Sequence, residues 1–247
     1  MFTGQNIIAL NEAASTNEEA AVLIRKNPPP EGTLIIAQRQ TSGKGQRGNT
    51  WLSEPGQNLT FSIIFYPVFL EPDKQFFLSK TLALGVFDFT GKILGQEVKI
   101  KWPNDIYCGD KKIGGMLIEN TIGSHKIISS VAGIGLNINQ VAFPGDLPNP
   151  SSFRKITGIL YSPEELLADL CLCIEARYLQ LKGRRLQAIN SDYLSGLYRF
   201  GERSLYSKGG KCFYARITDV SDDGKLELQK ENGKKDAFEM KEISFVI

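Results

Sequence analysis

The sequence has few of the residues that mark several common classes of protein. It contains one histidine, His125, in the segment Ile122–Lys126, which is typical of a hairpin turn. A single histidine disfavours histidine-rich metal sites, and a Ser-His-Asp triad would have to use this turn residue. We therefore predict that His125 is a surface loop residue.

Long apolar runs and targeting signals are also absent from the 247 residues. No apolar run approaches the roughly 20 residues that a membrane-spanning helix needs. The first ten residues have neither the basic segment nor the small-residue cleavage site of a signal peptide. We expect a cytoplasmic protein without a membrane partner.

Cysteine and net charge are both low. The four cysteines, Cys108, Cys171, Cys173 and Cys212, are expected to be free thiols in a cytoplasmic chain of this length. Lys and Arg total 29 against 27 Asp and Glu, a net charge of +2 that gives no reason to expect a nucleic-acid partner. With 42% hydrophobic and 23% charged residues, the chain is expected to fold around a core.

The pattern of residues predicts an α+β domain over residues 1–197 and a small all-β domain over residues 198–247. A capping box from Ser15 to Glu18 predicts a helix that ends near Lys26. Further helices are predicted at 76–94, 163–181 and 186–194, and strands at 33–37, 58–65, 98–102, 105–108, 112–119, 126–130 and 131–139.

The last 50 residues have a different character. Short strands are predicted at 205–206, 212–220, 225–230 and 237–247, separated by turns at Lys208–Gly210, Asp222–Gly224 and Glu231–Gly233. Asp-Gly and Asn-Gly between β-prone runs are strong hairpin signals. They predict a small barrel of antiparallel strands.

A glycine-rich loop, Gly43–Gly48, matches the G-x-G-x-x-G pattern of dinucleotide-binding folds. That pattern requires a helix directly after the loop, and here a strand follows. The segment also lacks the Gly-Lys-Ser/Thr tripeptide of a P-loop. Two interpretations remain from the loop alone: an anion-binding loop in which Lys44 and Arg47 supply charge, or a flexible surface loop.

The segment Lys101–Asp105 lies between two predicted strands and contains Pro103, which fixes a local bend. The bend can present Asn104 and Asp105 on one side. An amide beside a carboxylate suits a ribose, a magnesium phosphate or an incoming amine. An ordinary Asn-Asp turn is the alternative.

Two predicted strands, Lys112–Met116 and Ala132–Asn137, contain pairs of glycines. Glycine weakens a strand unless something must approach its backbone closely. The glycines thus predict either a flat floor for a planar ligand or a bulge. Asn137 and Asn139 in an apolar strand require hydrogen-bond partners from the backbone or a ligand.

Taken in order, these segments resemble the biotin–protein ligase family, in its short form without an N-terminal DNA-binding domain. The matching elements are Ser15–Asn17, Gln40, Gly43–Gly48 with Trp51, Lys101–Asp105, Lys112 with Gly115, and Gly133–Asn137. Glu242–Ser244 resembles the last strand of the family's SH3-like barrel. The resemblance implies a mixed-sheet catalytic domain of the biotin/lipoate ligase type followed by that barrel.

The resemblance also implies roles for individual residues. Lys112, Arg47 and Asp105 would be catalytic. The biotin-binding residues would be Ser15, Thr16, Gln40, Gly43, Lys44, Gly45, Lys112, Gly115, Gly133 and Gly135. The ATP-binding residues would be Arg47, Gly48, Asn49, Trp51, Asn104, Asp105, Lys112 and Asn137.

The implied activity is that of a biotin–[acetyl-CoA-carboxylase] ligase, which forms biotinyl-5'-AMP from biotin and ATP. The biotinyl group would pass to a lysine of a biotin carboxyl carrier domain. Mg²⁺ would enter with ATP, near Asp105, and no prosthetic group is expected. A lipoate or octanoate attachment enzyme and a non-catalytic biotin sensor are the alternatives, and the protein would be a monomer or a homodimer.

The sequence departs from the family's pattern at two loop positions. Lys44 and Gln46 stand where the family most often has arginine. Lysine keeps the charge of arginine but lacks its bidentate fork, and glutamine lacks the charge. The chain begins at the catalytic domain, and operator DNA is therefore not an expected partner.

Overall fold

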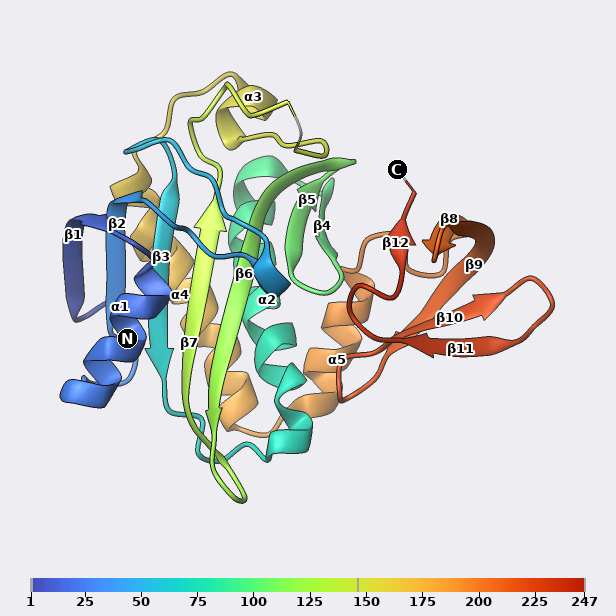
Figure 1. Cartoon of the computed structure of the whole chain (residues 1–247), viewed down its shortest axis with the longest axis horizontal. Coiled ribbons are helices and arrows are strands. Elements are labelled where there is room, and N and C mark those ends of the chain that lie inside the picture. Colours follow the sequence, from blue (N-terminus) through green and yellow to red (C-terminus); the bar gives the residue numbers. More distant parts are fainter. Residues whose placement is uncertain (1, 146, 247) are drawn as a thin grey trace.

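The computed structural model describes residues 2–145 and 147–246, with the side chain of Arg47 excepted. It contains a seven-stranded sheet flanked by helices and a separate five-stranded sheet formed by the C-terminal residues (Figure 1). The predicted α+β fold class is confirmed.

The larger sheet is mixed and has the strand order β1-β2-β3-β7-β6-β5-β4. Strands β1 and β2 are parallel, and every other neighbouring pair that the structure describes in this sheet is antiparallel. The strands are β1 (Ile7–Ala13), β2 (Leu34–Gln40), β3 (Leu59–Phe65), β4 (Val98–Lys101), β5 (Asp105–Cys108), β6 (Lys111–Ile122) and β7 (Ile127–Leu136).

Helices cover the two faces of this sheet unequally (Figure 1). The helices α2 (Phe76–Leu94), α4 (Pro163–Lys182) and α5 (Leu186–Ser195) enclose the main core on one face. A single helix, α1 (Thr16–Lys26), packs on part of the other face through Ala20. The short helices are η1 (Gln46–Gly48), η2 (Pro72–Lys74) and α3 (Phe153–Thr157).

Alternation along β3 separates the two faces. Leu59, Phe61, Ile63 and Phe65 point into the main core, since successive side chains of a strand point to opposite sides. Thr60 and Ser62 therefore lie on the face that carries α1. Because α1 covers only part of that face, the polar part of the sheet face remains accessible for a site.

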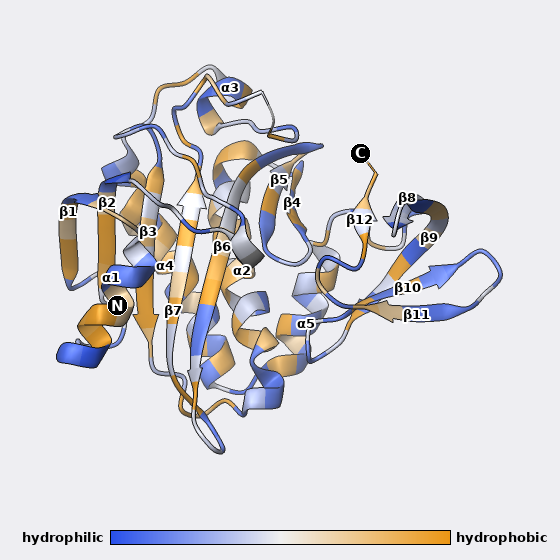
Figure 2. Cartoon of the chain, viewed as in Figure 1, coloured by the Kyte–Doolittle hydropathy of each residue, from blue (hydrophilic) through white to orange (hydrophobic). Residues whose placement is uncertain are grey.

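The C-terminal sheet has the order β11-β10-β9-β8-β12. Its strands are β8 (Ser204–Lys208), β9 (Lys211–Val220), β10 (Leu226–Lys230), β11 (Lys235–Phe238) and β12 (Ser244–Phe245). All three predicted turns connect antiparallel neighbours. Hydrophilic residues cover the outer end of the β10–β11 hairpin, whereas β3 and β7 at the centre of the molecule are mainly hydrophobic (Figure 2).

Several predicted boundaries were wrong. The strand β1 was not predicted, because as an edge strand it exposes Ile7 and alternates only weakly. The predicted strands 126–130 and 131–139 are one strand, β7, which spans Ile127–Leu136. The predicted strand 237–247 is interrupted after β11: Lys241 has a φ of 71°, which no regular strand accommodates, and β12 begins at Ser244. The helix α3 was also missed.

The C-terminal sheet is fixed to α2 by a buried lysine. Lys80 of α2 is fully buried and donates hydrogen bonds to Asn190 Oδ1 and to the carbonyl oxygen of Val220, each at 2.6 Å. Its ammonium group lies 5.0 Å from the centre of the Phe77 ring. Burial lowers the pKa of Lys80 to about 8, although Asp219 and Asp222 oppose the shift.

This lowered pKa predicts a pH-dependent stability. Between about pH 8 and 10.5 the unfolded chain retains the Lys80 proton that the folded chain has lost. The unfolded state then binds more protons at this group, so the contribution of Lys80 to folding stability rises by up to about 3 kcal/mol as the pH rises through this interval. Urea unfolding at pH 7, 9 and 10.5 should show the parent gaining stability relative to Lys80→Met.

The exposed residue Lys26 at the end of α1 provides the control. The difference in stability between Lys26→Met and the parent should stay constant with pH. A parent–Lys80→Met difference that is equally constant would contradict the assignment of a depressed pKa to Lys80.

Candidate active site

One cross-strand row organises the accessible face of the larger sheet. Register pairs join Thr60 to Gly135, Gly135 to Gly115, Gly115 to Asp105, and Asp105 to Lys101. Residues paired in this way point to the same side of a sheet. The row places the polar groups of Thr60, Asp105 and Lys101 around a glycine floor two strands wide.

A register shift adds Lys112 to this face. Beyond the pair Ile106–Gly114 the pairing moves by one residue, so that Tyr107 is opposite Lys112 and not Ile113. Without the shift Ile113 would lie on the site face, because a one-residue slip exchanges the two faces. Ile113 is instead fully buried in the main core. A bulge therefore lies within Lys112–Met116.

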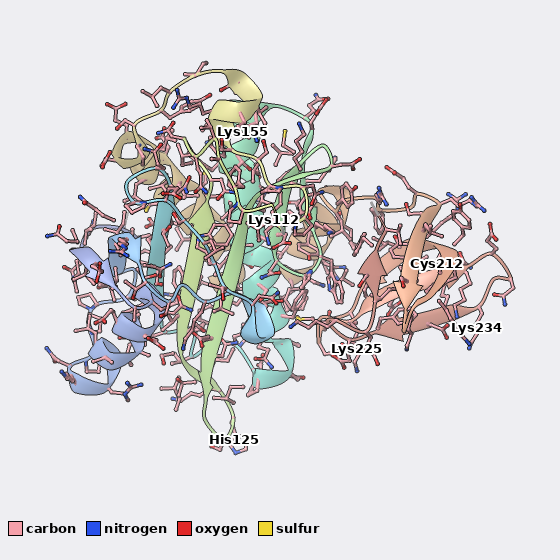
Figure 3. All side chains as sticks on the ribbon, turned by 45° about the horizontal axis from the view of Figure 1, so that its top comes forward. Lys112, His125, Lys155, Cys212, Lys225 and Lys234 are labelled. Atoms are coloured by element: carbon pink, nitrogen blue, oxygen red, sulfur yellow. The ribbon has the colours of Figure 1, made fainter. Side chains whose placement is uncertain are left out.

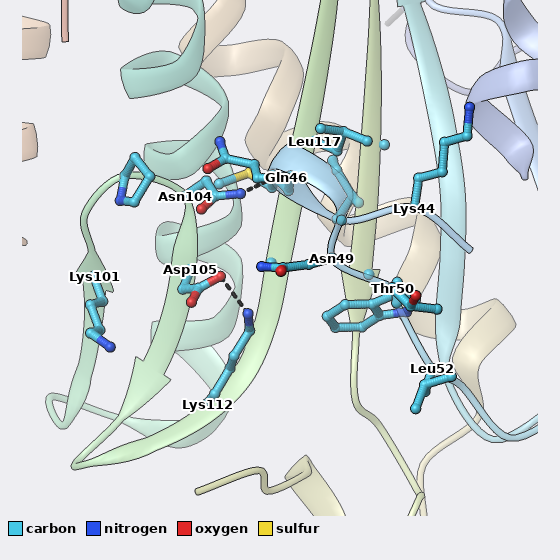
Figure 4. A pocket seen from close by; sticks show the side chains of 18 of the residues that line it. Lys44, Gln46, Asn49, Thr50, Leu52, Lys101, Asn104, Asp105, Lys112 and Leu117 are labelled. Carbon is cyan, nitrogen blue, oxygen red and sulfur yellow. Dashed lines mark hydrogen bonds and ion pairs between the residues drawn. The ribbon is translucent and has the colours of Figure 1, made fainter. Parts of the chain in front are cut away.

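The shift brings Lys112 beside Asp105. Their Nζ and Oδ1 atoms are 2.6 Å apart, and the side chains are 30% and 22% exposed (Figure 4). The backbone of Lys112 is held by a neighbouring segment: its N–H donates to the oxygen of Asn149 and its oxygen accepts from the N–H of Ser151. The backbone of Lys112 is thus anchored, and its ammonium group is paired with a carboxylate.

The bend before β5 ties Asn104 to the adjacent strand. Asn104 Nδ2 donates to the carbonyl oxygen of Met116, and the Asn104 carbonyl accepts from the Met116 N–H at 3.0 Å. The preceding Trp102–Pro103 peptide is cis. Asn104 therefore fixes the bend, and Asp105 is the member of the pair whose charged group meets Lys112.

A buried polar cluster lies at the start of α1. The Thr16 N–H donates to Gln40 Oε1 at 2.7 Å, and Ser62 Oγ lies 2.7 Å from Thr16 Oγ1 and 2.6 Å from Asn17 Oδ1. Asn17 Nδ2 donates to Glu119 Oε2 at 2.7 Å. Such a connected network offers donors and acceptors in fixed positions.

The predicted capping box is wrong. Ser15 does occupy the N-cap position of α1, but its side chain makes no capping hydrogen bond. Glu18 instead pairs with Lys44 of the glycine-rich loop, with Oε1 and Nζ 2.6 Å apart. The hydrogen bond that Lys44 donates to the Glu18 carboxylate raises the pKa of Lys44. Figure 4 shows Lys44 directed away from Lys112 and Asp105.

Side chains of the protein pack against the glycine floor. A Cβ on Gly135 would stand 2.3 Å from Cε2 of Trp51, and a Cβ on Gly133 would stand 2.3 Å from Asn17 Oδ1. A Cβ on Gly115 would stand 3.1–3.5 Å from side-chain atoms of Asp105 and Lys112. The indole Nε1 of Trp51 is buried without a hydrogen-bond partner among the described residues, and the ring is held by packing on the floor and by the Lys112 ammonium group, 5.9 Å from the ring centre.

These groups surround one cavity of about 1360 Å³. It is also lined by Lys101 and by residues far away in sequence: Phe143, Leu147–Pro150, Met240, Lys241 and Ile243–Phe245. The predicted site residues that line it are Ser15, Thr16, Gln40, Lys44, Gly45, Asn49, Trp51, Asn104, Asp105, Lys112, Gly115, Gly133, Gly135 and Asn137.

Three predicted residues are not in this group. Gly43 lies below the lining, where a Cβ would come within 2.4 Å of the Trp51 carbonyl oxygen, and Gly48 turns the chain with a φ of 85°. Both shape the loop instead of facing the cavity. The side chain of Arg47 lies outside the described part of the structure.

Sequence analysis assigned no role to several lining residues. Thr60 could have been found, because it is one of two polar residues at alternate positions of an otherwise apolar strand. Lys101 belonged to a recognised segment but received no function. Glu242–Ser244 was recognised as a barrel strand, but the segment around it received no role in the site, since it reaches the cavity only through the packing of the C-terminal sheet.

The histidine and the cysteines, to which sequence analysis assigned no role in the site, behave as predicted. His125 is exposed at the tip of the β6–β7 hairpin, away from Lys112 (Figure 3). All four cysteines are free thiols. Within residues 2–145 and 147–246, no cluster of three or more His, Cys, Asp or Glu could hold a metal, and no helix is long and apolar enough to cross a membrane.

Comparison with known proteins identifies the family. Residues 12–139 match the model of the biotin/lipoate A/B protein ligase family, which spans more than half of the chain. The chain belongs to this family. It is 30% identical over 231 residues to a biotin–[acetyl-CoA-carboxylase] ligase of Paracoccus denitrificans, covering 89% of this chain and 92% of that protein.

Two further comparisons extend over nearly the whole chain. The bifunctional ligase/repressor BirA of Bacillus spizizenii is 29% identical over 239 residues, covering 95% of this chain and 73% of that protein. Among solved structures, biotin protein ligase from Aquifex aeolicus in complex with biotin and ATP is similar with a TM-score of 0.79 and 26% identity, covering 97% of this chain and 98% of that chain. The predicted family and fold are confirmed.

The contact between Trp51 and the floor leads to a test in this family member. Gly135→Ala should displace the Trp51 ring, because the new Cβ would lie 2.3 Å from it. Because the indole forms no hydrogen bond among the described residues, the displaced ring should release the loop, and trypsin should cleave after Lys44 about fivefold faster or more. Gly91→Ala in α2, where a Cβ meets nothing within 4 Å, is the matched control. Equal cleavage of both variants would disprove the packing role of Trp51.

Proposed function

We propose that this protein joins biotin and ATP into biotinyl-5'-AMP and transfers the biotinyl group to a lysine of a biotin carboxyl carrier domain. The observation that carries the proposal is the arrangement on one sheet face. Thr16 and Gln40, members of a polar cluster that Ser62 supports from beneath, and a charged pair, Lys112–Asp105, lie on the walls of a single cavity.

The polar cluster suits the ureido ring of biotin. A ureido group carries one carbonyl acceptor and two N–H donors, so it can replace hydrogen bonds within a network of hydroxyl and amide groups. A lipoyl dithiolane offers only weak sulfur acceptors and would leave such a network unsatisfied. The cluster thus favours biotin over lipoate or octanoate.

The charged pair suits the other end of the reaction. The biotin carboxylate attacks the α-phosphorus of ATP, a new P–O bond forms, and the bond to pyrophosphate breaks. Negative charge grows on the α-phosphate oxygens in the transition state, where the Lys112 ammonium group would stabilise it. Asp105 keeps Lys112 oriented until the substrates enter.

Magnesium would arrive with the nucleotide. Among the described residues, Asp105 is the one carboxylate that lines the cavity, a donor set that fits an ion held mainly by the phosphates. When bound, the ion neutralises phosphate charge. Asn137, whose Oδ1 is buried without a described partner, would meet the adenine side.

The second step needs no further catalytic group. An amine of the carrier lysine attacks the carbonyl carbon of the mixed anhydride, the C–O bond to AMP breaks, and AMP leaves with the electron pair. Positioning supplies most of the acceleration, as for other reactions between bound partners. Lys44 would leave Glu18 and join Arg47 at the adenylate when the loop closes.

The C-terminal domain would take part in the site. We place the boundary between Leu197 and Tyr198, and the hydrogen bond from Trp102 Nε1 to the Gly224 oxygen joins the two sides at 3.0 Å. With Met240–Phe245 in the cavity wall, the domain would enclose the phosphate end of ATP.

Lys112→Ala should cripple adenylation and leave biotin binding nearly unchanged. The ammonium group stabilises charge that appears only in the transition state, so its loss lowers kcat. A lost preorganised charge contact costs on the order of 3 kcal/mol, or about a hundredfold in rate. Biotin-dependent ATP–pyrophosphate exchange and calorimetric biotin affinity measure the two effects.

Lys111→Ala, at the exposed neighbouring position that begins β6, is the control and should behave like the parent. Lys112→Arg should rescue partly, because a planar guanidinium differs in shape from a compact ammonium group. Near-normal exchange by Lys112→Ala would exclude the assigned role. Parent protein that binds biotin and shows no exchange would instead support the non-catalytic sensor.

A further inference from the structure

Lys101 ends the polar row on the site face. Its register partner is Asp105, and it lies on the edge strand β4, at the side of the cavity opposite Thr60. Figure 4 shows Lys101 on the far side of Asp105 from Lys112. The sheet therefore carries a further lysine besides Lys112 on this side of the cavity. Lys101 lies on β4, two strands from Lys112 on β6.

The Lys101 side chain is held by two aromatic residues. Its Nζ donates to Tyr107 Oη at 3.0 Å and lies 4.6 Å from the centre of that ring. The same Nζ lies 5.2 Å from the centre of the Phe245 ring in β12. Aromatic faces hold an ammonium group without neutralising it. Both sheets thus position the ammonium group, although burial lowers the pKa of Lys101 and Asp105 opposes the shift.

The two lysines differ in how their charge is compensated. Lys112 forms an ion pair with Asp105 at 2.6 Å. Lys101 forms no ion pair within 4.0 Å among residues 2–145 and 147–246. A half-buried ammonium group without a carboxylate partner is an unfavourable arrangement unless an anion completes it. Lys101 accordingly favours a multiply charged anionic ligand.

We propose that Lys101 is a catalytic residue that binds the pyrophosphate leaving group during adenylation. This inference rests on the proposed function. As the carboxylate oxygen of biotin bonds to the α-phosphorus, the bond to the bridging oxygen breaks, and that oxygen leaves with the electron pair on pyrophosphate. Lys112 stabilises charge on the α-phosphate, and Lys101 receives the charge that departs.

Phe245 is a positioning residue in this arrangement. It does not touch the reacting atoms, but its ring borders Lys101 from the C-terminal sheet, where it also packs edge-on against Tyr206, with ring centres 5.2 Å apart. The C-terminal domain would in this way act on pyrophosphate through one lysine of the catalytic domain.

The test separates the two half-reactions. In Lys101→Gln we expect biotin-dependent ATP–pyrophosphate exchange to fall at least about tenfold and the KM for pyrophosphate to rise about tenfold, the effect of one lost charge contact. Transfer from added biotinyl-5'-AMP to a carrier domain should stay within about twofold of the parent, because pyrophosphate takes no part in it. Calorimetric biotin affinity should not change.

Lys101→Arg and Lys99→Gln complete the set. The arginine variant retains the charge and should recover most of the exchange. Lys99 is on the same strand and does not line the cavity, so Lys99→Gln should match the parent. Normal exchange by Lys101→Gln, or an equal loss in both half-reactions, would overturn the proposal. Parent protein without biotin-dependent exchange would overturn the proposed function as well.

A double-mutant cycle tests Phe245. Phe245→Leu should raise the KM for pyrophosphate about threefold, and Phe245→Tyr should restore it. In the background of Lys101→Gln, the leucine substitution should have no further effect on this KM, since the residues act as a unit. Additive effects would show that Phe245 acts independently of Lys101, by supporting the fold.

Discussion

The one-residue register shift between β5 and β6 determines what this site can do. It exchanges Ile113 for Lys112 on the accessible face and places an ammonium group 2.6 Å from Asp105. In an unshifted ladder, the same sequence would direct the lysine away from Asp105 and an isoleucine into a polar cavity. The shift occurs where a glycine pair follows, because residues without side chains accommodate the altered backbone.

A second constraint is the unequal covering of the larger sheet. The main core lies between the sheet and α2, α4 and α5, so that face requires continuous apolar residues. The other face is covered by α1 only in part, and polar residues such as Ser62 can lie beside the helix start without entering the main core. Binding groups are thus carried on the strands that the core makes rigid.

The parts that sequence analysis predicted are those fixed by local chemistry. The helix α2 ends where predicted because Gly95, with a φ of 82°, stops an apolar helical pattern. The hairpin turns of the C-terminal sheet were likewise encoded by Asp-Gly and Asn-Gly. The ordered motifs identified the family, and they included most residues around the cavity. Edge strand β1 was missed because it is specified by pairing with β2 and not by its own pattern.

The residues that sequence analysis left without a role share a different property: their function depends on register or on packing between domains. Lys101 meets the cavity because four successive strand pairings align it with Thr60, and Phe245 reaches it because Lys80 and Trp102 hold the C-terminal sheet in place. No window of neighbouring residues contains that information. A family motif therefore identifies the groups predicted to bind substrate more readily than the contacts that orient those groups.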